Sequence, residues 1–338
     1  MKKTASLLIS FLLILITNAQ SVFVLDGASG TRVYSTIDTA MYYAQDGDYL
    51  YLPAASISLN PSGMQIKKRM TIIGAGHYPD STQATGVTSI TGTVYFLTQS
   101  SGSILQGVYI NGNIYFGTDN TNGAATNILI SRCNVSGIHL SYNGTDFWGS
   151  EFVNIKDNII RETISFANVK NVTVENNIIE GSLQYGNGMI TVRNNIFLRR
   201  VANMVYYIFA TRFDNNIIMS SASFSYGGSG NLYYNNIFKE TDPLGAEFSS
   251  GNQFNVTDLF VNQSGTGFVY TQNYHLTPTS PARAAGMAGT DCGIYGGANP
   301  YKEGAVPVNP HIQTKLLPAQ TDAQGKINVQ VKVAAQNQ

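Results

Sequence analysis

Charged side chains recur in predicted turns of the central chain, at spacings that could support binding or acid–base chemistry. Glu162 and Glu180 lie 18 residues apart, and the pair Arg199 and Arg200 follows within 20 residues. Two guanidinium groups beside a carboxylate could grip an anionic group, because arginine offers paired N–H donors. The same groups could act as acid and base. Ordinary solvated turn residues are the favoured interpretation.

Three uncharged polar side chains, His139, Gln184 and Tyr206, lie in the short strand segments near those turns. An imidazole could act as a base, and the amide and the hydroxyl could hydrogen-bond a ligand. A surface role is favoured for His139. The four histidines of the chain lack metal-ligand spacing, so we expect no metal ligands. Asp119 and the asparagines beside it could hold Ca²⁺, but one carboxylate is a poor hard-cation site and a plain turn is favoured.

A repeated sequence motif positions these side chains. It consists of an alternating strand, an asparagine pair and two apolar residues. The second asparagine recurs at steps of 24, 19, 18, 21 and 20 residues, which is the period of a solenoid coil. Asparagine tolerates the left-handed backbone of a tight corner, and stacked amides can bond one another. The expected structural ladder is Asn134, Asn158, Asn177, Asn195, Asn216 and Asn236.

Two residues before this ladder runs a second column, which we expect on an exposed strand face. Neighbouring members largely alternate in charge, which favours a solvated charge ladder over a binding stripe. The column is Arg132, Lys156, Glu175, Arg193, Asp214 and Tyr234.

Composition and the N-terminal segment indicate an exported β protein. The formal net charge is zero and only 12% of the residues are charged, so the chain has no basic stripe for nucleic acid. Residues 1–19 have lysines, a short apolar run and a small-residue ending, which is typical of a secretory signal peptide. The run is too short to span a bilayer. We therefore expect a periplasmic, surface or secreted protein with free thiols at Cys133 and Cys292.

One solenoid domain should occupy residues 20–301, with a capping helix near 35–45 covering its first coil. Residues 302–338 begin with a proline-containing linker and end in a strictly alternating segment. Ile327, Val329, Val331 and Val333 lie on one face of that segment. We expect this strand to pack back on the solenoid.

Segments at both ends of the predicted solenoid resemble a known family. They are Asp46–Asp48, Leu52–Pro53 and Lys68–Gly76 near the start, and Asn273–Leu276 and Asp291–Gly297 near the end. Their order is similar to that of secreted bacterial proteins of the pectate-lyase-like superfamily. The resemblance implies an all-β, right-handed parallel β-helix with about 20 residues per coil. It also implies an asparagine ladder between the second and third sheets, and substrate on the first sheet. It does not fix an activity, because the fold hosts lyases, hydrolases, esterases and adhesins.

On that topology, the strand after each apolar pair belongs to the first sheet. Its expected outward residues include no carboxylate; they are His139, Ser141, Thr163, Ser165, Ser182, Gln184, Met204, Tyr206, Ser223 and Ser225. The lyases and hydrolases of the family need clustered carboxylates. An aromatic column in the same sheet could be an inward core stack, which is favoured, or an outward sugar-stacking platform. Its members are Tyr142, Phe166, Tyr185, Tyr206 or Tyr207, and Phe224 or Tyr226.

The sequence thus favours a non-catalytic protein that binds polysaccharide or cell-surface glycans or mediates adhesion, with no catalytic residue or cofactor assigned. One alternative is a polysaccharide lyase or glycoside hydrolase that acts on acidic polysaccharide through the turn residues. The other alternative is a structural spacer in an extracellular assembly.

Overall fold

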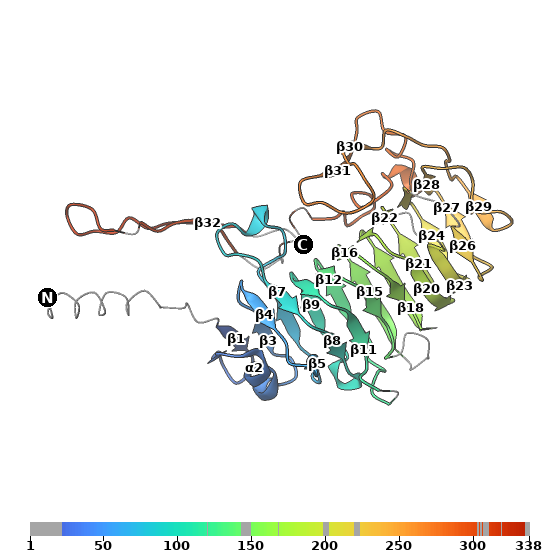
Figure 1. Ribbon diagram of the computed structural model, residues 1–338. Coiled ribbons are helices and arrows are strands. Elements are labelled where there is room, and N and C mark those ends of the chain that lie inside the picture. The colour runs from blue at the N-terminus through green and yellow to red at the C-terminus, as the bar shows by residue number, and fades with distance from the viewer. Residues whose placement is uncertain are drawn as a thin grey trace, which may run out of the picture.

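The chain folds into a parallel β-helix of about eight turns, with about 21 residues per turn (Figure 1). This confirms the all-β solenoid expected from the repeat. Three long sheets run along the solenoid, with 12, nine and eight strands among the described residues, and we call them sheets A, B and C. The computed structural model describes residues 22–119, 121–142, 150–167, 169–198, 203–219, 224–302, 304, 306, 311–318 and 320–334. The predicted signal peptide lies outside the described residues.

Sheet A contributes the first strand of each regular coil. Its strands are parallel except at β1, which pairs antiparallel with β2 and β3. In spatial order they are β2 (Arg32–Tyr34), β1 (Phe23–Asp26), β3 (Tyr49–Tyr51), β6 (Thr71–Ile73), β9 (Ile104–Gln106), β12 (Leu129–Ser131), β15 (Glu151–Lys156), β18 (Lys170–Glu175), β21 (Ile190–Arg193), β24 (Arg212–Asp214), β27 (Leu232–Tyr234) and β29 (Phe248–Ser250).

Sheets B and C supply the other two sides of each coil. Sheet B consists of β28 (Ile237–Phe238), β25 (Ile217–Ile218), β22 (Ile196–Phe197), β19 (Ile178–Ile179), β16 (Ile159–Ile160), β13 (Asn134–Val135), β10 (Tyr109–Asn111), β7 (Ser89–Thr91) and β4 (Ser56–Ser58). Sheet C consists of β26 (Ser225–Tyr226), β23 (Val205–Phe209), β20 (Leu183–Asn187), β17 (Ile164–Ser165), β14 (Ile138–His139), β11 (Ile114–Phe116), β8 (Val94–Phe96) and β5 (Met64–Ile66).

Alternate side chains point into the solenoid, and equivalent residues of successive coils stack. In sheet A, Ile155, Val174 and Val192 are direct register partners and are fully buried. β-Branched side chains pack well on a pleated surface, and burying each one contributes about 1.5–3 kcal/mol. The sheet A strands therefore keep a period of two, with the inward residues forming one continuous core.

The asparagine pairs form the corner between sheets A and B. The second asparagine of each pair is buried, and its side-chain oxygen accepts hydrogen bonds from the preceding coil at 2.9–3.0 Å. Its amide also donates to a backbone carbonyl, as Asn177 does to Ile155 at 2.8 Å. This hydrogen-bonded column contains Asn158, Asn177, Asn195, Asn216, Asn236 and Asn252.

Two details of the predicted corner need correction. Asn134 is not a ladder member, because its register partner is Ile159, and Cys133 stands opposite Asn158 instead. The left-handed backbone belongs to the first residue of each pair, not to the second, as the φ angles of 55–57° at Asp157, Asn176 and Asn194 show. The second asparagine is thus free to direct its amide along the stack.

The expected capping helix is present as α2 (Ile37–Tyr43). Thr36 is its N-cap, and the Thr36 hydroxyl accepts a hydrogen bond from the Thr39 amide at 3.2 Å. Ile37 and Ala40 of this helix are buried in the main core. Two short 3₁₀ segments, η1 (Asp80–Thr82) and η2 (Thr98–Ser100), lie in the loops of the early coils.

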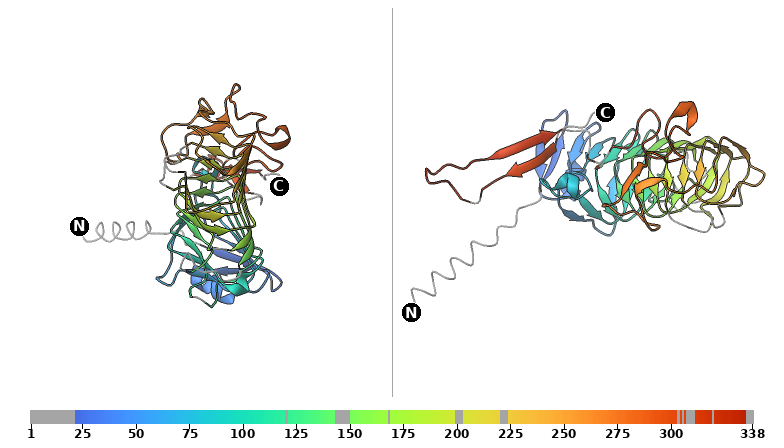
Figure 2. Two further views of the ribbon diagram at one scale, coloured as in Figure 1. Left: turned by 90° about the vertical axis from the view of Figure 1, so that its right-hand side faces the viewer. Right: turned by 90° about the horizontal axis from the view of Figure 1, so that it is seen from above.

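Residues 256–301, which we call the cover, pack across the outer face of sheet B (Figure 2). They include the antiparallel pair β30 (Phe260–Asn262) and β31 (Asn273–Leu276), and the 3₁₀ segment η3 (Met287–Gly289). Both members of each apolar pair are buried for this reason. In β16, Ile160 points into the solenoid, whereas Ile159 joins a second core beneath the cover.

The tail differs from expectation. The alternating strand β33 (Gln330–Ala334) pairs antiparallel with β32 (His311–Leu316), and this tail hairpin extends away from the solenoid (Figures 1 and 2). The four aliphatic side chains expected to be buried, from Ile327 to Val333, are 52–60% exposed. The prediction that this strand covers an edge of the solenoid is therefore wrong. An alternating pattern predicts a strand but not the partner of that strand.

Candidate functional site

The outer face of sheet C carries one in-register column of polar and aromatic side chains, which we call the tyrosine column. In the described chain, none of the eight strands of sheet C contains Asp, Glu, Lys or Arg. The column therefore contains no carboxylate, ammonium or guanidinium group. Its members are Gln65, Tyr95, Tyr115, His139, Ser165, Gln184, Tyr206 and Tyr226.

Three rings stack at the N-terminal end of the tyrosine column. The ring centroids of Tyr95 and Tyr115 are 6.1 Å apart, and those of Tyr115 and His139 are 4.5 Å apart with planes inclined by 11°. Partial burial lowers the pKa of His139, so the imidazole is neutral at pH 7. Thr93, Tyr95, Tyr115 and Tyr142 line a shallow cleft of about 460 Å³ here. Tyr142 is 45% exposed at its edge.

Four tyrosines form a second cluster at the C-terminal end. Tyr206 stacks on Tyr226 with centroids 5.7 Å apart, and Tyr185 stacks on Tyr207 at 6.3 Å. Tyr185 and Tyr207 both have left-handed backbone, which turns their side chains out of the regular alternation. Gly227 lies beneath Tyr207, and a Cβ there would come within 2.7 Å of the ring. Tyr226 is 54% exposed.

Small polar side chains separate the two aromatic clusters. Ser165 and Gln184 occupy the intervening positions of the column. The Gln184 amide donates to the Ser182 hydroxyl at 2.7 Å, and the Thr163 and Ser182 hydroxyls are 3.2 Å apart. With strands spaced about 4.8 Å apart, the six steps from Tyr95 to Tyr226 span roughly 29 Å. The face is long enough for several units of a linear polymer.

The sequence-predicted site residues are only partly brought together. His139, Gln184 and Tyr206 lie in the tyrosine column. Glu162 is exposed in a turn. Glu180 is engaged by the cover, because its carboxylate accepts a hydrogen bond from the Phe268 amide at 2.9 Å. Arg199 and Arg200, which are predicted to bind an anionic sugar beside Glu180, lie outside the described residues.

The exposure of side chains in sheet C also departs from expectation. Ser141, Ser165, Ser182 and Met204, all expected on the outward face, are buried. Ser165 nevertheless keeps its place in the outward column, because it is the register partner of His139 and Gln184. The aromatic column divides: Phe166 is buried, whereas the tyrosines at positions 142, 207 and 226 are 39–54% exposed. The inward interpretation of this column is therefore wrong for these three tyrosines. Irregular left-handed residues interrupt the simple alternation on which it depended.

Tyr95 and Tyr115 were not identified from the sequence as site residues. The signal is present, because Val94-Tyr95-Phe96 and Ile114-Tyr115-Phe116 repeat the same pattern 20 residues apart. These strands are exact register partners, with the valine, isoleucine and phenylalanines buried and the tyrosines outward. This repeat is harder to recognise in the sequence, because the early coils lack the asparagine pair that marks the later coils.

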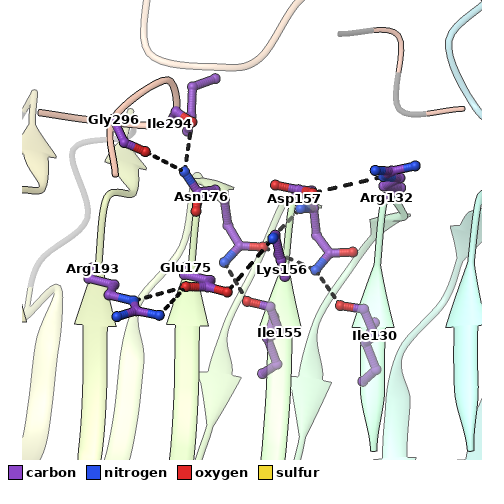
Figure 3. Close-up of polar contacts among 12 residues, drawn as sticks. Ile130, Arg132, Ile155, Lys156, Asp157, Glu175, Asn176, Arg193, Ile294 and Gly296 are labelled. Carbon is purple, nitrogen blue, oxygen red and sulfur yellow. Dashed lines mark hydrogen bonds and ion pairs between the residues drawn. The ribbon is translucent and has the colours of Figure 1, made fainter. Parts of the chain in front are cut away.

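The charged column lies on the outer face of sheet A, and its members neutralise one another (Figure 3). Glu175 accepts hydrogen bonds from Arg193 at 2.6 and 2.8 Å and lies 3.9 Å from the Lys156 ammonium. Farther along, Arg212 binds Asp214 at 2.6 Å. This arrangement fits a structural charge ladder.

Arg132 does not belong to that column, because Ser131 is the register partner of Lys156. Arg132 lies at the corner instead, where its Nε is 3.8 Å from the Asp157 carboxylate and its guanidinium donates to the Val306 carbonyl at 2.9 Å (Figure 3). Burial raises the pKa of Asp157 to about 7, although Lys156 and Arg132 oppose the shift. This pair joins the corner to the segment after the cover.

In the loop considered as a Ca²⁺ site, hydrogen bonds within the loop engage the one carboxylate, that of Asp119. The Asp119 carboxylate accepts bonds from the Thr121 amide and hydroxyl at 2.8 and 2.6 Å and from Asn122 at 2.9 Å. The side-chain and backbone hydrogen bonds from Thr121 lower the pKa of Asp119. Among the described residues, no group of three or more His, Cys, Asp or Glu side chains could hold a metal ion. Cys133 and Cys292 are buried free thiols.

Within the described parts of the chain, no helix has both the length and the apolar character needed to cross a bilayer. Comparison with known proteins found no matching family model, no matching curated protein and no matching solved structure. The function of this chain has to be argued from its own surface.

Proposed function

We propose that this protein is a non-catalytic binder of neutral polysaccharide, which lies along the tyrosine column of sheet C. The observation that carries the proposal is the row of stacked, partly exposed rings on a face whose strands contain no charged residue. A polysaccharide has apolar ring faces and hydroxyl edges. Tyrosine offers an apolar ring with a polar tip, so one side chain can contact both.

The absence of charged side chains from these strands favours neutral over acidic sugars. Binding a uronate on this face would desolvate its carboxylate without a cation in the strands to pair with it, which is costly. A neutral chain only needs hydrogen-bonding groups, which His139, Gln184 and the tyrosine hydroxyls can provide. The glycan-binding hypothesis from the sequence is thereby narrowed to neutral polymers.

The resemblance to pectate-lyase-like proteins supports the choice of face. The asparagine ladder lies between sheets A and B, so sheet C corresponds to the first sheet of that superfamily, on which its members bind substrate. The expected signal peptide supports an exported protein that meets glycans outside the cytoplasm.

Affinity electrophoresis through gels that contain a polysaccharide tests the proposal. We expect neutral glucans, mannans or xylans to retard the protein more than pectate or alginate, and Tyr115→Ala to lose most of this retardation. Tyr42→Ala is the matched control, because Tyr42 is 77% exposed on α2, outside sheet C. Equal retardation of Tyr115→Ala and the parent protein would contradict the proposal, as would preference for the acidic polymers.

The same polymers, recovered after prolonged incubation, separate binding from cleavage. We expect unchanged chain length by size-exclusion chromatography. Shortened polymer would show that the protein cleaves polysaccharide and is not a non-catalytic binder.

A further inference from the structure

A small cleft opens where the end of the cover crosses the corner between sheets A and B. Its volume is about 220 Å³. Glu175, Arg193, Asn194 and Asp214 line it from the solenoid, and Met287 and Thr290 line it from the cover. The cleft lies on a different side of the solenoid from the tyrosine column.

The corner asparagines beside this cleft mostly hold the cover in place. Asn176 donates to the Ile294 and Gly296 carbonyls at 2.7 and 3.3 Å (Figure 3), and the Asn215 side-chain oxygen accepts a bond from the Met287 amide at 2.9 Å. Asn235 similarly donates to the Ala285 carbonyl at 3.0 Å. Each of these side chains spans the gap between the solenoid and the cover.

Asn194 departs from this pattern. Its side chain is 4% exposed, yet its Nδ2 donor has no hydrogen-bond partner among the described residues. The Oδ1 acceptor of Asp214, a residue that is 7% exposed, also lacks a partner within the part of the chain that the structure describes. Both residues line the cleft. Buried polar atoms are nearly always bonded, so a buried donor and a buried acceptor beside one cavity call for an occupant.

The charges around the cleft indicate a neutral occupant. Glu175 is paired with Arg193, and the other oxygen of Asp214 is paired with Arg212. A cation would be repelled by these arginines, and an anion by the carboxylates. A hydroxyl group both accepts and donates, so it can satisfy the Asn194 donor and the Asp214 acceptor together.

We propose that this cleft is a second binding site that takes one hydroxylated, uncharged unit, such as a terminal sugar residue or a polyol. One hydroxyl accepts from Asn194 Nδ2, and the same or a neighbouring hydroxyl donates to Asp214 Oδ1. The volume is below the range of about 300–1,000 Å³ typical of pockets for drug-sized ligands, so a single unit fits better than a chain. This site does not depend on polysaccharide binding by sheet C.

Ligand-observed NMR with methyl glucoside, methyl galactoside and mannitol tests the proposal on the full-length protein. We expect saturation transfer to at least one probe, with binding at least fivefold weaker in Asn194→Gly and Asp214→Asn. Glycine suits the Asn194 position, because Gly107 and Gly251 have φ angles of 71° and 69° at the equivalent place in other coils. Asn235→Gly is the matched control, since it removes another corner asparagine outside the cleft.

Tyr115→Ala should leave binding of these small probes unchanged, which separates this site from the tyrosine column. A crystal soaked with the best probe should show the probe bonded to Asn194 and Asp214. The proposal is overturned if no probe binds, if Asn194→Gly binds as tightly as the parent protein, or if the cleft holds only ordered water.

Discussion

The outer faces of sheets B and C belong to the same solenoid, but the cover buries the outer face of sheet B, whereas the outer face of sheet C is partly exposed. On sheet B, the outward column from Ile159 to Ile237 is isoleucine in five successive coils, and all five are buried beneath the cover. On sheet C, the outward column is tyrosine, histidine, serine and glutamine, with several rings partly exposed.

This contrast shows how a β-helix distinguishes an internal interface from an exposed surface. Stacked aliphatic side chains offer only apolar contact, so the chain covers them with its own residues. Stacked tyrosines combine an apolar face with a hydroxyl, and they remain compatible with water until a ligand replaces it. Substitutions on the two faces should therefore separate stability from binding.

The largest effect is expected beneath the cover. Ile217→Ala should destabilise the protein by about 2–5 kcal/mol, because Ile217 is fully buried between sheet B and Gly293 of the cover and truncation leaves a cavity. Urea unfolding measures the change. At temperatures where the variant remains folded, polysaccharide retardation should be unaltered. A strong loss of retardation in the folded variant would contradict the separation of the two faces.

Protonation at the corner under the cover should have the next largest effect. Burial raises the pKa of Asp157 to about 7, so the folded protein holds this proton at pH values where the unfolded chain has lost it. This contribution to stability is complete below about pH 4 and is lost as pH rises to about 7. At about 1.36 kcal/mol per pKa unit, it amounts to at most about 4 kcal/mol.

Urea unfolding of the parent protein and Asp157→Asn at pH 5 and pH 8 measures this contribution. We expect the parent to lose more stability than the variant between the two pH values. Asparagine already occupies the equivalent corner position in the next coils, so the backbone should accept it. Identical pH dependence in both proteins would rule out Asp157 as the titrating group.

On the exposed outer face of sheet C, a substitution should weaken polysaccharide binding and hardly change the free energy of unfolding. Tyr115→Ala should weaken binding of a neutral polysaccharide about tenfold, which corresponds to about 1.4 kcal/mol, because it removes the middle ring of the three-ring stack. Titration calorimetry with a soluble oligosaccharide measures the affinity. Unfolding in urea serves as the control, and a large loss of stability would show that the ring is structural instead.

The smallest effect is expected on the charged face of sheet A. Glu175→Gln should cost about 1 kcal/mol or less. The Glu175 side chain is only 9% exposed, but glutamine keeps an oxygen that can accept from Arg193, and the Arg193 side chain is 48% exposed and can be solvated. Polysaccharide retardation should not change. If retardation fell, the charged column would have to be counted as part of the binding surface.

Much of the fold was predictable because the repeat encodes it locally. The asparagine pair marks a corner wherever it occurs, and the flanking alternation fixes which strand positions face inward. In the coil that contains Arg132 and Cys133, the repeat predicts a register that differs by one residue from the observed one, because these two residues replace the asparagine pair and Asn134 follows directly after them. A single-residue slip exchanges the inward and outward faces, so the error moved both Arg132 and Asn134 to the wrong columns.

The candidate site was less predictable, because it depends on contacts between distant segments. Glu180 was expected beside the binding face, but the Phe268 amide 88 residues later engages it. The two apolar residues of each pair give no indication of which one the cover will bury. The alternation of β33 identified a strand, while pairing with β32 left its aliphatic face exposed.

The sequence alone determined the parallel solenoid, its coil length, its capping helix and most of the asparagine ladder, because these features arise from residues within one coil and their repetition in the next. Only the tertiary structure decided which outer face is covered, which rings remain exposed and which buried amide lacks a partner. Those outcomes depend on where the cover, residues 256–301, packs. The stability of that packing comes from contacts with coils far earlier in the chain, such as the hydrogen bond of Tyr301 with Tyr78, 223 residues away.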